Sequence, residues 1–141
     1  MARLINRYDQ TIDDKGRLVL PAAHRERYEA GAVLANRGDH LAVYEPREWD
    51  HFVEQLRDAR MAGNISRSQF NLVTMNAADP KPDSAGRILI PSWMREAVGL
   101  GKDVLVGGVH EYLAIYPKTH LEDIDPHEWE SASHAIDALG L

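Results

Sequence analysis

The chain has 141 residues, 44% of them hydrophobic, and a formal net charge of −6, which suits one ordinary domain or two small halves sharing a core. It has no cysteine, so disulfides, thiolate chemistry and cysteine-based zinc sites are excluded. The chain contains no apolar run of about 18 residues, the length that a membrane-spanning helix needs. The opening residues also lack the apolar stretch of a secretory signal, so we expect a cytoplasmic protein with no membrane partner.

Positive charge gathers at the N-terminal end of this acidic chain. Residues 1–28 carry six cations, Arg3 and Arg7 among them, and four anions, whereas the remainder has a net charge of −8. Overall acidity argues weakly against binding of nucleic acid, but the local distribution decides where a polyanion can bind. Ordinary charge scatter remains the alternative interpretation.

The sequence pattern of the first part of the chain, up to Tyr44, predicts several strands and one short helix. After an extended segment and a turn at Asp14–Arg17, aliphatic residues predict a buried strand at Leu18–Leu20. Pro21 then stands where a helix can begin, before AAHRERY. Two further strands are expected, at Val33–Asn36 and Leu41–Tyr44.

Two helices are expected in the middle of the chain. The first helix is expected at Pro46–Ala62. One face of it would carry the apolar residues Trp49, Phe52, Val53 and Leu56. Ser66–Ala77 opens on a serine suited to capping a helix. Gly63 and Asn64 separate the two helices.

The second half repeats the layout of the first. DSAGRILIP at Asp83–Pro91 restates DDKGRLVLP at Asp13–Pro21, and residues 13–26 and 83–96 are identical at six of fourteen positions. LAIYP at 113–117 likewise matches LAVYEP at 41–46. Order and spacing persist, so we infer an internal duplication in which each half completes the other. The predicted divisions are 5–48 and 77–124 for the repeats, 49–76 for the linking helices and 125–141 for the tail.

Within the second half, strands are expected at Ile88–Ile90, Val104–Val106 and Leu113–Tyr116, with a short helix, SWMREAV, after Pro91. Pro80 and Pro82 cannot donate to a strand ladder, so the strand leading into this repeat should be an edge strand or be broken. Residues after Asp125 could form a docking helix or a frayed end.

Each repeat turns at a glycine, Gly16 or Gly86, a residue that adopts positive φ without steric cost. Asp13 precedes Arg17 by four residues, as Asp83 precedes Arg87, and across a hairpin this spacing can pair carboxylate with guanidinium. One interpretation is that both pairs only brace their turns.

The other interpretation is that the first turn presents cations to a polyanion. The first copy has Asp14 and Lys15 where the second has Ser84 and Ala85. Since the second copy turns with alanine, the charge of Lys15 is not needed for bracing. We therefore expect the first turn to face a polyanion and the second to be chiefly architectural.

These motifs resemble the MraZ family, whose members have an AbrB/SpoVT-like swapped-hairpin fold. The resemblance rests on D-x-K-G-R-L-x-x-P, the second D-x-x-G-R-[IL] and the L-x-[VI]-Y after each, and covers roughly residues 5–124. It implies an α+β, mainly β protein in which two swapped-hairpin repeats form a pseudo-two-fold barrel with short flanking helices. It also implies a bacterial regulator of transcription, acting on the division and cell-wall gene cluster and on its own promoter as a homo-oligomeric ring at the nucleoid.

The expected partners are therefore double-stranded DNA and further copies of the chain, with no small-molecule substrate and no cofactor. Arg17 is the candidate for base recognition, because arginine pairs bidentately with guanine. Lys15, Arg3 and Arg7 are candidates for phosphate contacts. Arg25 and Arg95 recur at one place in both halves, which favours structural salt bridges over DNA contacts.

Two other classes of function stay open. Seven histidines invite a search for a metal-dependent enzyme, but no H-E-x-x-H, Walker A, G-x-S-x-G or G-x-G-x-x-G pattern occurs, so no catalytic or metal residue is assigned. The second alternative is an AbrB-like antitoxin, or another interaction module, that acts through the tail at 125–141.

Overall fold

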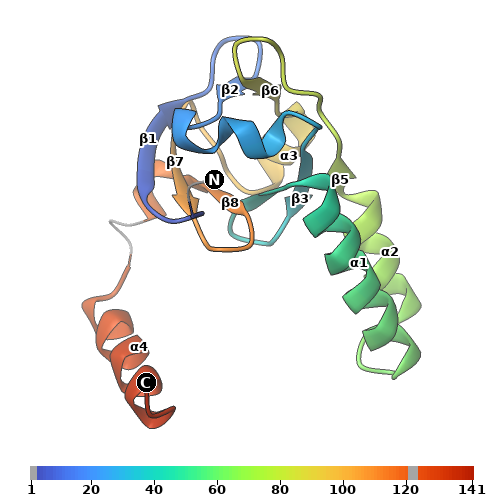
Figure 1. The fold of residues 1–141 in the computed structure, drawn as a ribbon, viewed down its shortest axis with the longest axis vertical. Coiled ribbons are helices and arrows are strands. Elements are labelled where there is room, and N and C mark those ends of the chain that lie inside the picture. The colour runs from blue at the N-terminus through green and yellow to red at the C-terminus, as the bar shows by residue number, and fades with distance from the viewer. Residues whose placement is uncertain (1–2, 121–123) are drawn as a thin grey trace.

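The computed structural model describes residues 3–120 and 124–141, which form an α+β fold with mostly antiparallel strands (Figure 1). The first repeat contains β1 (Arg7–Thr11), β2 (Arg17–Val19), the 3-10 helix η1 (Ala22–Tyr28), β3 (Val33–Asn36) and β4 (Leu41–Tyr44). Helices α1 (Pro46–Met61) and α2 (Arg67–Met75) follow. The second repeat contains β5 (Ala77–Ala78), β6 (Arg87–Leu89), α3 (Ser92–Ala97), β7 (Asp103–Gly108), β8 (Leu113–Pro117) and the 3-10 helix η2 (Lys118–His120). Helix α4 (Pro126–Ala138) ends the chain.

The two repeats exchange strands, as the duplicated sequence predicts. Their strands interleave in a six-stranded sheet of order β1-β7-β8-β4-β3-β5 and a two-stranded ribbon of β2 and β6. In the sheet β1 pairs with β7, β5 with β3, and β4 with β8, all antiparallel. Neither half can therefore complete its sheet without the other, which gives the expected pseudo-two-fold arrangement.

The core lies between the ribbon and the sheet. Leu18 and Ile88 stand opposite each other in the ribbon and are fully buried. They belong to one apolar cluster with sheet residues such as Leu34, Leu113 and Ile115. Burying a side chain of this kind contributes about 1.5–3 kcal/mol to folding, so the aliphatic runs after the two turns hold the repeats together.

Local sequence explains where the central helices begin. Pro46 occupies the first turn of α1, where its missing N–H costs no hydrogen bond. Ser66 caps α2 in a capping box: the Gln69 N–H donates to the Ser66 hydroxyl at 3.0 Å, and the Ser66 N–H donates to the Gln69 side chain at 2.8 Å.

Two details of the second repeat differ from those of the first. As expected from Pro80 and Pro82, its leading strand is reduced to the two residues of β5, at one edge of the sheet. Strand β7 runs on through Gly107 and Gly108, two residues beyond the expected end at Val106. A side chain at Gly108 would overlap the backbone of Leu4 and Ile5, so glycine lets the N-terminal segment cross there.

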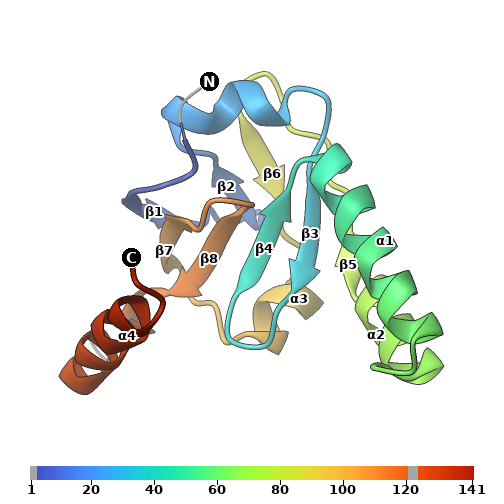
Figure 2. The same cartoon turned by 60° about the horizontal axis from the view of Figure 1, so that its bottom comes forward.

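The helices lie on two flanks of the β-body. Helices α1 and α2 form a hairpin on one flank and α4 stands on the other, both extending away from the end that carries the two turns (Figures 1 and 2). No helix in the described parts of the chain is both long and apolar enough to span a bilayer.

Candidate nucleic-acid interface

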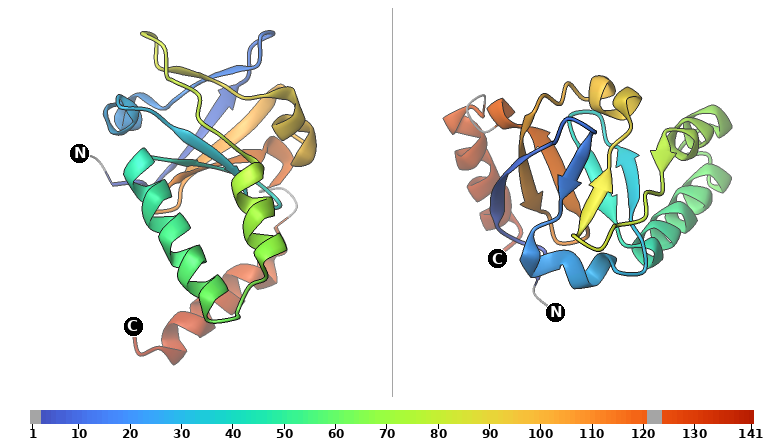
Figure 3. Two further views of the ribbon diagram at one scale, coloured as in Figure 1. Left: turned by 90° about the vertical axis from the view of Figure 1, so that its right-hand side faces the viewer. Right: turned by 90° about the horizontal axis from the view of Figure 1, so that it is seen from above.

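The two glycine turns project from the same end of the molecule, with their tips pointing apart (Figure 3). They lead into β2 and β6, which pair with Arg17 opposite Leu89 and Val19 opposite Arg87. Strand pairing in the ribbon thus brings together two segments that lie seventy residues apart in sequence.

The first turn is braced by the carboxylate of Asp13. Its Oδ1 accepts the backbone N–H groups of Lys15 at 3.0 Å and Arg17 at 2.9 Å, and its Oδ2 accepts the Arg17 Nε–H at 2.8 Å. The pKa of Asp13 is lowered chiefly by the Arg17 backbone N–H, with the Arg17 side chain adding to the effect. Gly16 closes the turn at a φ of +82°.

The second turn has the same hydrogen bonds. Asp83 accepts the N–H groups of Ala85 at 3.0 Å and Arg87 at 2.9 Å, and the Arg87 Nε–H at 2.7 Å. The pKa of Asp83 is likewise lowered chiefly by the Arg87 backbone N–H, with the Arg87 side chain adding to the effect. The brace is therefore common to both repeats and does not distinguish one turn from the other.

The turns also interlock with each other. The Ile90 N–H donates to the carbonyl of Gly16 at 2.8 Å, and the Leu20 N–H donates to that of Gly86 at 2.9 Å. Each turn is thereby joined to the end of the opposite repeat's strand, which holds the two tips in a defined relative position.

Arg25 and Arg95 complete the interlock by donating to backbone carbonyls, where we expected carboxylate partners. The Arg25 Nε–H donates to the Leu20 carbonyl at 2.9 Å, and the Arg95 Nε–H donates to the Ile90 carbonyl at 3.1 Å. Arg25 also packs over Gly86, and Arg95 over Gly16. Their recurrence in the sequence signalled a structural role, but a repeat alignment does not reveal that each arginine packs on the other repeat's glycine.

The tips differ in their side chains and not in their backbone hydrogen bonds. Lys15 is exposed at the tip of the first turn, beside Asp14, and exposed Ala85 and Ser84 take those places in the second. Arg17 and Arg87 occupy equivalent, partly exposed positions at the base of each turn. Lys15 therefore adds a cation to a turn whose backbone geometry does not depend on it.

Arg3 and Arg7 are not brought to these tips. Arg7 begins β1 opposite Gly107, and Leu4 accepts the His110 N–H at 2.8 Å, beside the β7–β8 connection. Asp13 lies six positions after Arg7 along extended chain, a distance of about 20 Å at the usual rise of a strand. The candidate DNA-binding residues are thus divided between two ends of β1.

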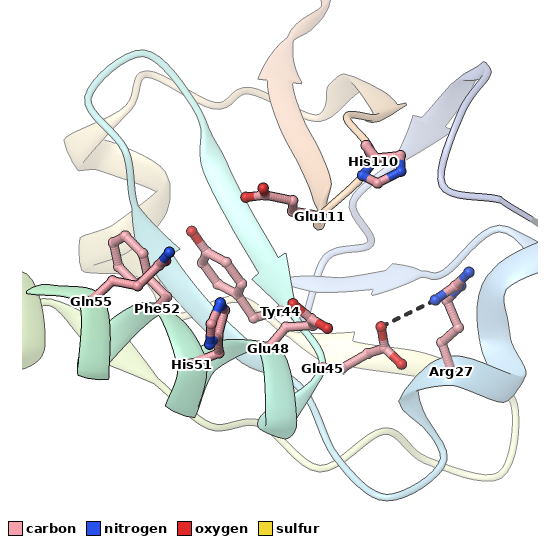
Figure 4. Close-up of a pocket in the computed structure, with 9 residues that line it drawn as sticks. All are labelled: Arg27, Tyr44, Glu45, Glu48, His51, Phe52, Gln55, His110 and Glu111. Carbon is pink, nitrogen blue, oxygen red and sulfur yellow. Dashed lines mark hydrogen bonds and ion pairs between the residues drawn. The ribbon is translucent and has the colours of Figure 1, made fainter.

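A separate pocket of about 290 Å³ lies where α1 meets β4 (Figure 4). Glu45 pairs with Arg27 at 3.2 Å on one side, and the other lining side chains include Glu48, His51 and Glu111. Within residues 3–120 and 124–141, no group of three or more His, Cys, Asp or Glu side chains is arranged to hold a metal ion.

Strand exchange between two repeats, with a braced glycine turn in each, defines a protein with a duplicated AbrB-like swapped-hairpin domain. A family model described as "MraZ protein, putative antitoxin-like" matches residues 4–69 and 73–139. The chain belongs to the MraZ family.

Curated relatives match along most of the chain. A protein of Lachnoclostridium phytofermentans is 37% identical over 90% of this chain and 84% of its own length. One from Salinispora tropica is 35% identical over 79% of each chain, and one from Roseiflexus sp. (strain RS-1) is 30% identical over 95% of this chain and 89% of its own. Each of the three is named "Transcriptional regulator MraZ".

Proposed function

We propose that this protein regulates transcription by binding specific sequences in double-stranded DNA through the first-repeat turns of an oligomer. Its relatives are named transcriptional regulators, which supports the general role. We choose the first turn as the DNA-binding surface because of one difference between two identically braced turns. Only the first has a cation, Lys15, at its tip.

In this proposal Arg17 recognises a base and Lys15 contacts phosphate. The Arg17 Nε–H is donated to Asp13, which orients the guanidinium group, so its terminal nitrogens would pair with guanine O6 and N7. Such a bidentate contact contributes about 1–3 kcal/mol of discrimination between bases. Arg3 and Arg7 would contribute phosphate contacts away from the tip, because they lie at the other end of β1.

One turn offers too few contacts for useful affinity, so the proposal includes several copies of the chain. A ring would present identical turns to a DNA site with repeated motifs, and avidity would multiply the weak individual contacts. Resemblance to the family suggests the division and cell-wall gene cluster and the protein's own promoter as targets, and hence a place in the cytoplasm at the nucleoid.

Fluorescence anisotropy with DNA from upstream of the protein's own gene, compared with scrambled DNA, tests this function. We expect the wild type to prefer the upstream DNA and Arg17→Ala to lose that preference at least tenfold, which corresponds to about 1.4 kcal/mol and lies within the range for one bidentate base contact.

Arg87→Ala is the matched control, because it removes the same Nε–H bond from the second turn. If both variants lose affinity equally, the effect comes from lost bracing and Arg17 does not recognise a base. If the wild type binds upstream and scrambled DNA equally well at low salt, sequence-specific recognition of that DNA is ruled out.

A further inference from the structure

The pocket where α1 meets β4, hereafter the α1 pocket, takes no part in the proposed binding of DNA. Val43 belongs to the main core, so its neighbour Tyr44, which lines the pocket, points to the opposite face of the sheet, away from the β2–β6 ribbon. Residues of both repeats meet there, because Glu45 and Glu48 lie at the start of α1 and Glu111 lies between β7 and β8. The α1 pocket is therefore a separate site that the two halves of the chain share.

The α1 pocket carries negative charge. Its lining has three carboxylates and one guanidinium, which gives a net charge of −2 with the histidines neutral. Glu45 pairs with Arg27 at 3.2 Å, and within residues 3–120 and 124–141 no ion pair involves Glu48 or Glu111. Figure 4 shows these two approaching the pocket from different elements, α1 and the β7–β8 connection. Two separated negative charges are thus left for a ligand.

Tyr44 is an independent sign that the pocket receives a ligand. It is only 3% exposed, and among the described residues nothing forms a hydrogen bond with its hydroxyl group. The hydroxyl is turned into the pocket, toward Glu111 (Figure 4). Burial raises the pKa of Tyr44 to about 12, and the negative charge of Glu111 adds to the effect. Buried polar groups in proteins are usually hydrogen-bonded, and a bound ligand would supply the partner for this one.

The position of Glu111 is fixed by the short connection that carries it. The preceding residue, His110, has a φ of +74°, a conformation that is uncommon for residues with a side chain. Its N–H donates to the Leu4 carbonyl at 2.8 Å, and the Val109 N–H donates to the Tyr112 carbonyl at 3.1 Å. These bonds hold the connection in one conformation, so the carboxylate stands ready at the pocket.

The shape of the α1 pocket suits an organic cation better than a metal ion. Its volume, about 290 Å³, is near the lower end of the range for small-molecule sites. In the described parts of the chain, no three His, Cys, Asp or Glu side chains converge as metal ligands. The stacked rings of Tyr44 and Phe52, 5.3 Å apart, give the lining an apolar part. An apolar chain with a positive group at each end would match both the rings and the two carboxylates.

We propose that the α1 pocket binds a diamine, an alkyl chain that carries an ammonium group at each end. One ammonium group pairs with Glu48 and the other with Glu111, and the Tyr44 hydroxyl accepts a hydrogen bond from one of them. The methylene groups lie against the rings of Tyr44 and Phe52. This site is independent of the turns and of DNA, so it adds to the proposed function without resting on it.

Isothermal titration calorimetry on the full chain, without DNA, tests the site. The probes are 1,4-diaminobutane, 1,5-diaminopentane and 1,6-diaminohexane, each compared with the monoamine of the same length, at physiological ionic strength so that exposed charges are screened. We expect one diamine to bind at least tenfold more tightly than its monoamine, because the second ammonium group gains a hydrogen bond between charged partners. Affinity should also peak at one chain length, since the two carboxylates stand a fixed distance apart.

Three variants assign the contacts. Glu48→Gln and Glu111→Gln should each weaken binding of that diamine at least tenfold, since each removes one charge and keeps the shape. Tyr44→Phe should weaken binding about fivefold, as for one hydrogen bond. It should not lower the melting temperature, because the hydroxyl has no partner among the described residues. Glu54→Gln is the matched control: it makes the same change on α1 outside this pocket, and binding should be unchanged.

Each contrary outcome overturns the proposal. Absence of heat with every diamine would show that the pocket takes no such ligand. Equal affinity for the monoamine would replace the diamine by a single positive group, such as the lysine side chain of a protein. An equal loss in Glu54→Gln would show only general attraction to an acidic surface. Binding of Mg²⁺ alone that depends equally on Glu48 and Glu111 would assign the pocket to a metal ion.

Discussion

At the scale of single residues, Gly86 meets two structural requirements at once. Its φ is +76°, a region that residues with a side chain rarely occupy. A Cβ atom placed there would also lie 2.6 Å from Cδ of Arg25, which packs across the turn. Glycine at this position therefore serves both the turn and the contact between repeats.

We predict that Gly86→Ala destabilises the protein more than an equivalent change at an open turn. The left-handed backbone alone costs about 1–2 kcal/mol, and displacement of Arg25 adds to this. Gly63→Ala is the control, because Gly63 has a φ of +81° and a Cβ atom at that position would meet nothing within 4 Å. Urea unfolding measures the difference in free energy of unfolding, and equal losses would show that the Arg25 contact contributes nothing.

At the scale of elements, each turn is a small unit held by an ionised carboxylate. Asp13 and Asp83 each accept three N–H groups at equivalent positions of their own turns, and these bonds lower the pKa of both side chains. A lowered pKa in the folded state means that the charged form is favoured by folding. The two braces thus make the stability of the β2–β6 ribbon dependent on pH.

The sign of this dependence follows from linkage. The contribution of the braces is fully present above the unfolded pKa, about 3.9, and is lost as the pH falls through the lower folded values. We therefore predict that the melting temperature drops as the pH falls below about 4, and drops less in the double variant Asp13→Asn, Asp83→Asn. Asp14→Asn, next to the first brace but outside it, should keep the wild-type dependence; identical pH profiles for all three proteins would contradict the assignment.

At the scale of the whole molecule, the interlocked turns hold the tip that carries Lys15 at a fixed position, which the proposed binding of DNA by several copies would use. Affinity for DNA should then depend on how many tips engage at once and on how many phosphates they neutralise. Each neutralised phosphate changes the slope of log K against log salt by about −0.9. The slope of the salt dependence therefore reports the number of phosphate contacts, and it can be measured without knowing the operator sequence.

We predict that Lys15→Ala makes this slope shallower by about 0.9 for each engaged turn. The variant should keep its fold, since the second turn has alanine at the equivalent position and the same hydrogen bonds. The measurement is anisotropy across a salt series, with DNA carrying one motif or several. An unchanged slope would show that Lys15 does not contact phosphate.

Much of this architecture was predictable from local patterns. The strands of both repeats, the helices after each turn and the capped helix that begins after Ser66 follow from aliphatic runs, proline positions and capping chemistry. The reduction of β5 followed from Pro80 and Pro82. The continuation of β7 through Gly107 and Gly108 was not predicted, because the glycine at 108 is required by the N-terminal segment that crosses there and not by a turn.

By itself, the sequence determined the duplication, the two braced turns and the cation that sets the first apart. These depend on spacings of a few residues, where backbone conformation and nearby hydrogen bonds dominate. Only the tertiary structure decided that β1 pairs with β7 across the repeats, that Arg25 packs on Gly86, and that Arg3 and Arg7 lie away from the tips. Strand pairing depends on contacts between residues far apart in the chain and on burial of the core that the repeats share. Local sequence patterns therefore do not predict which strands pair.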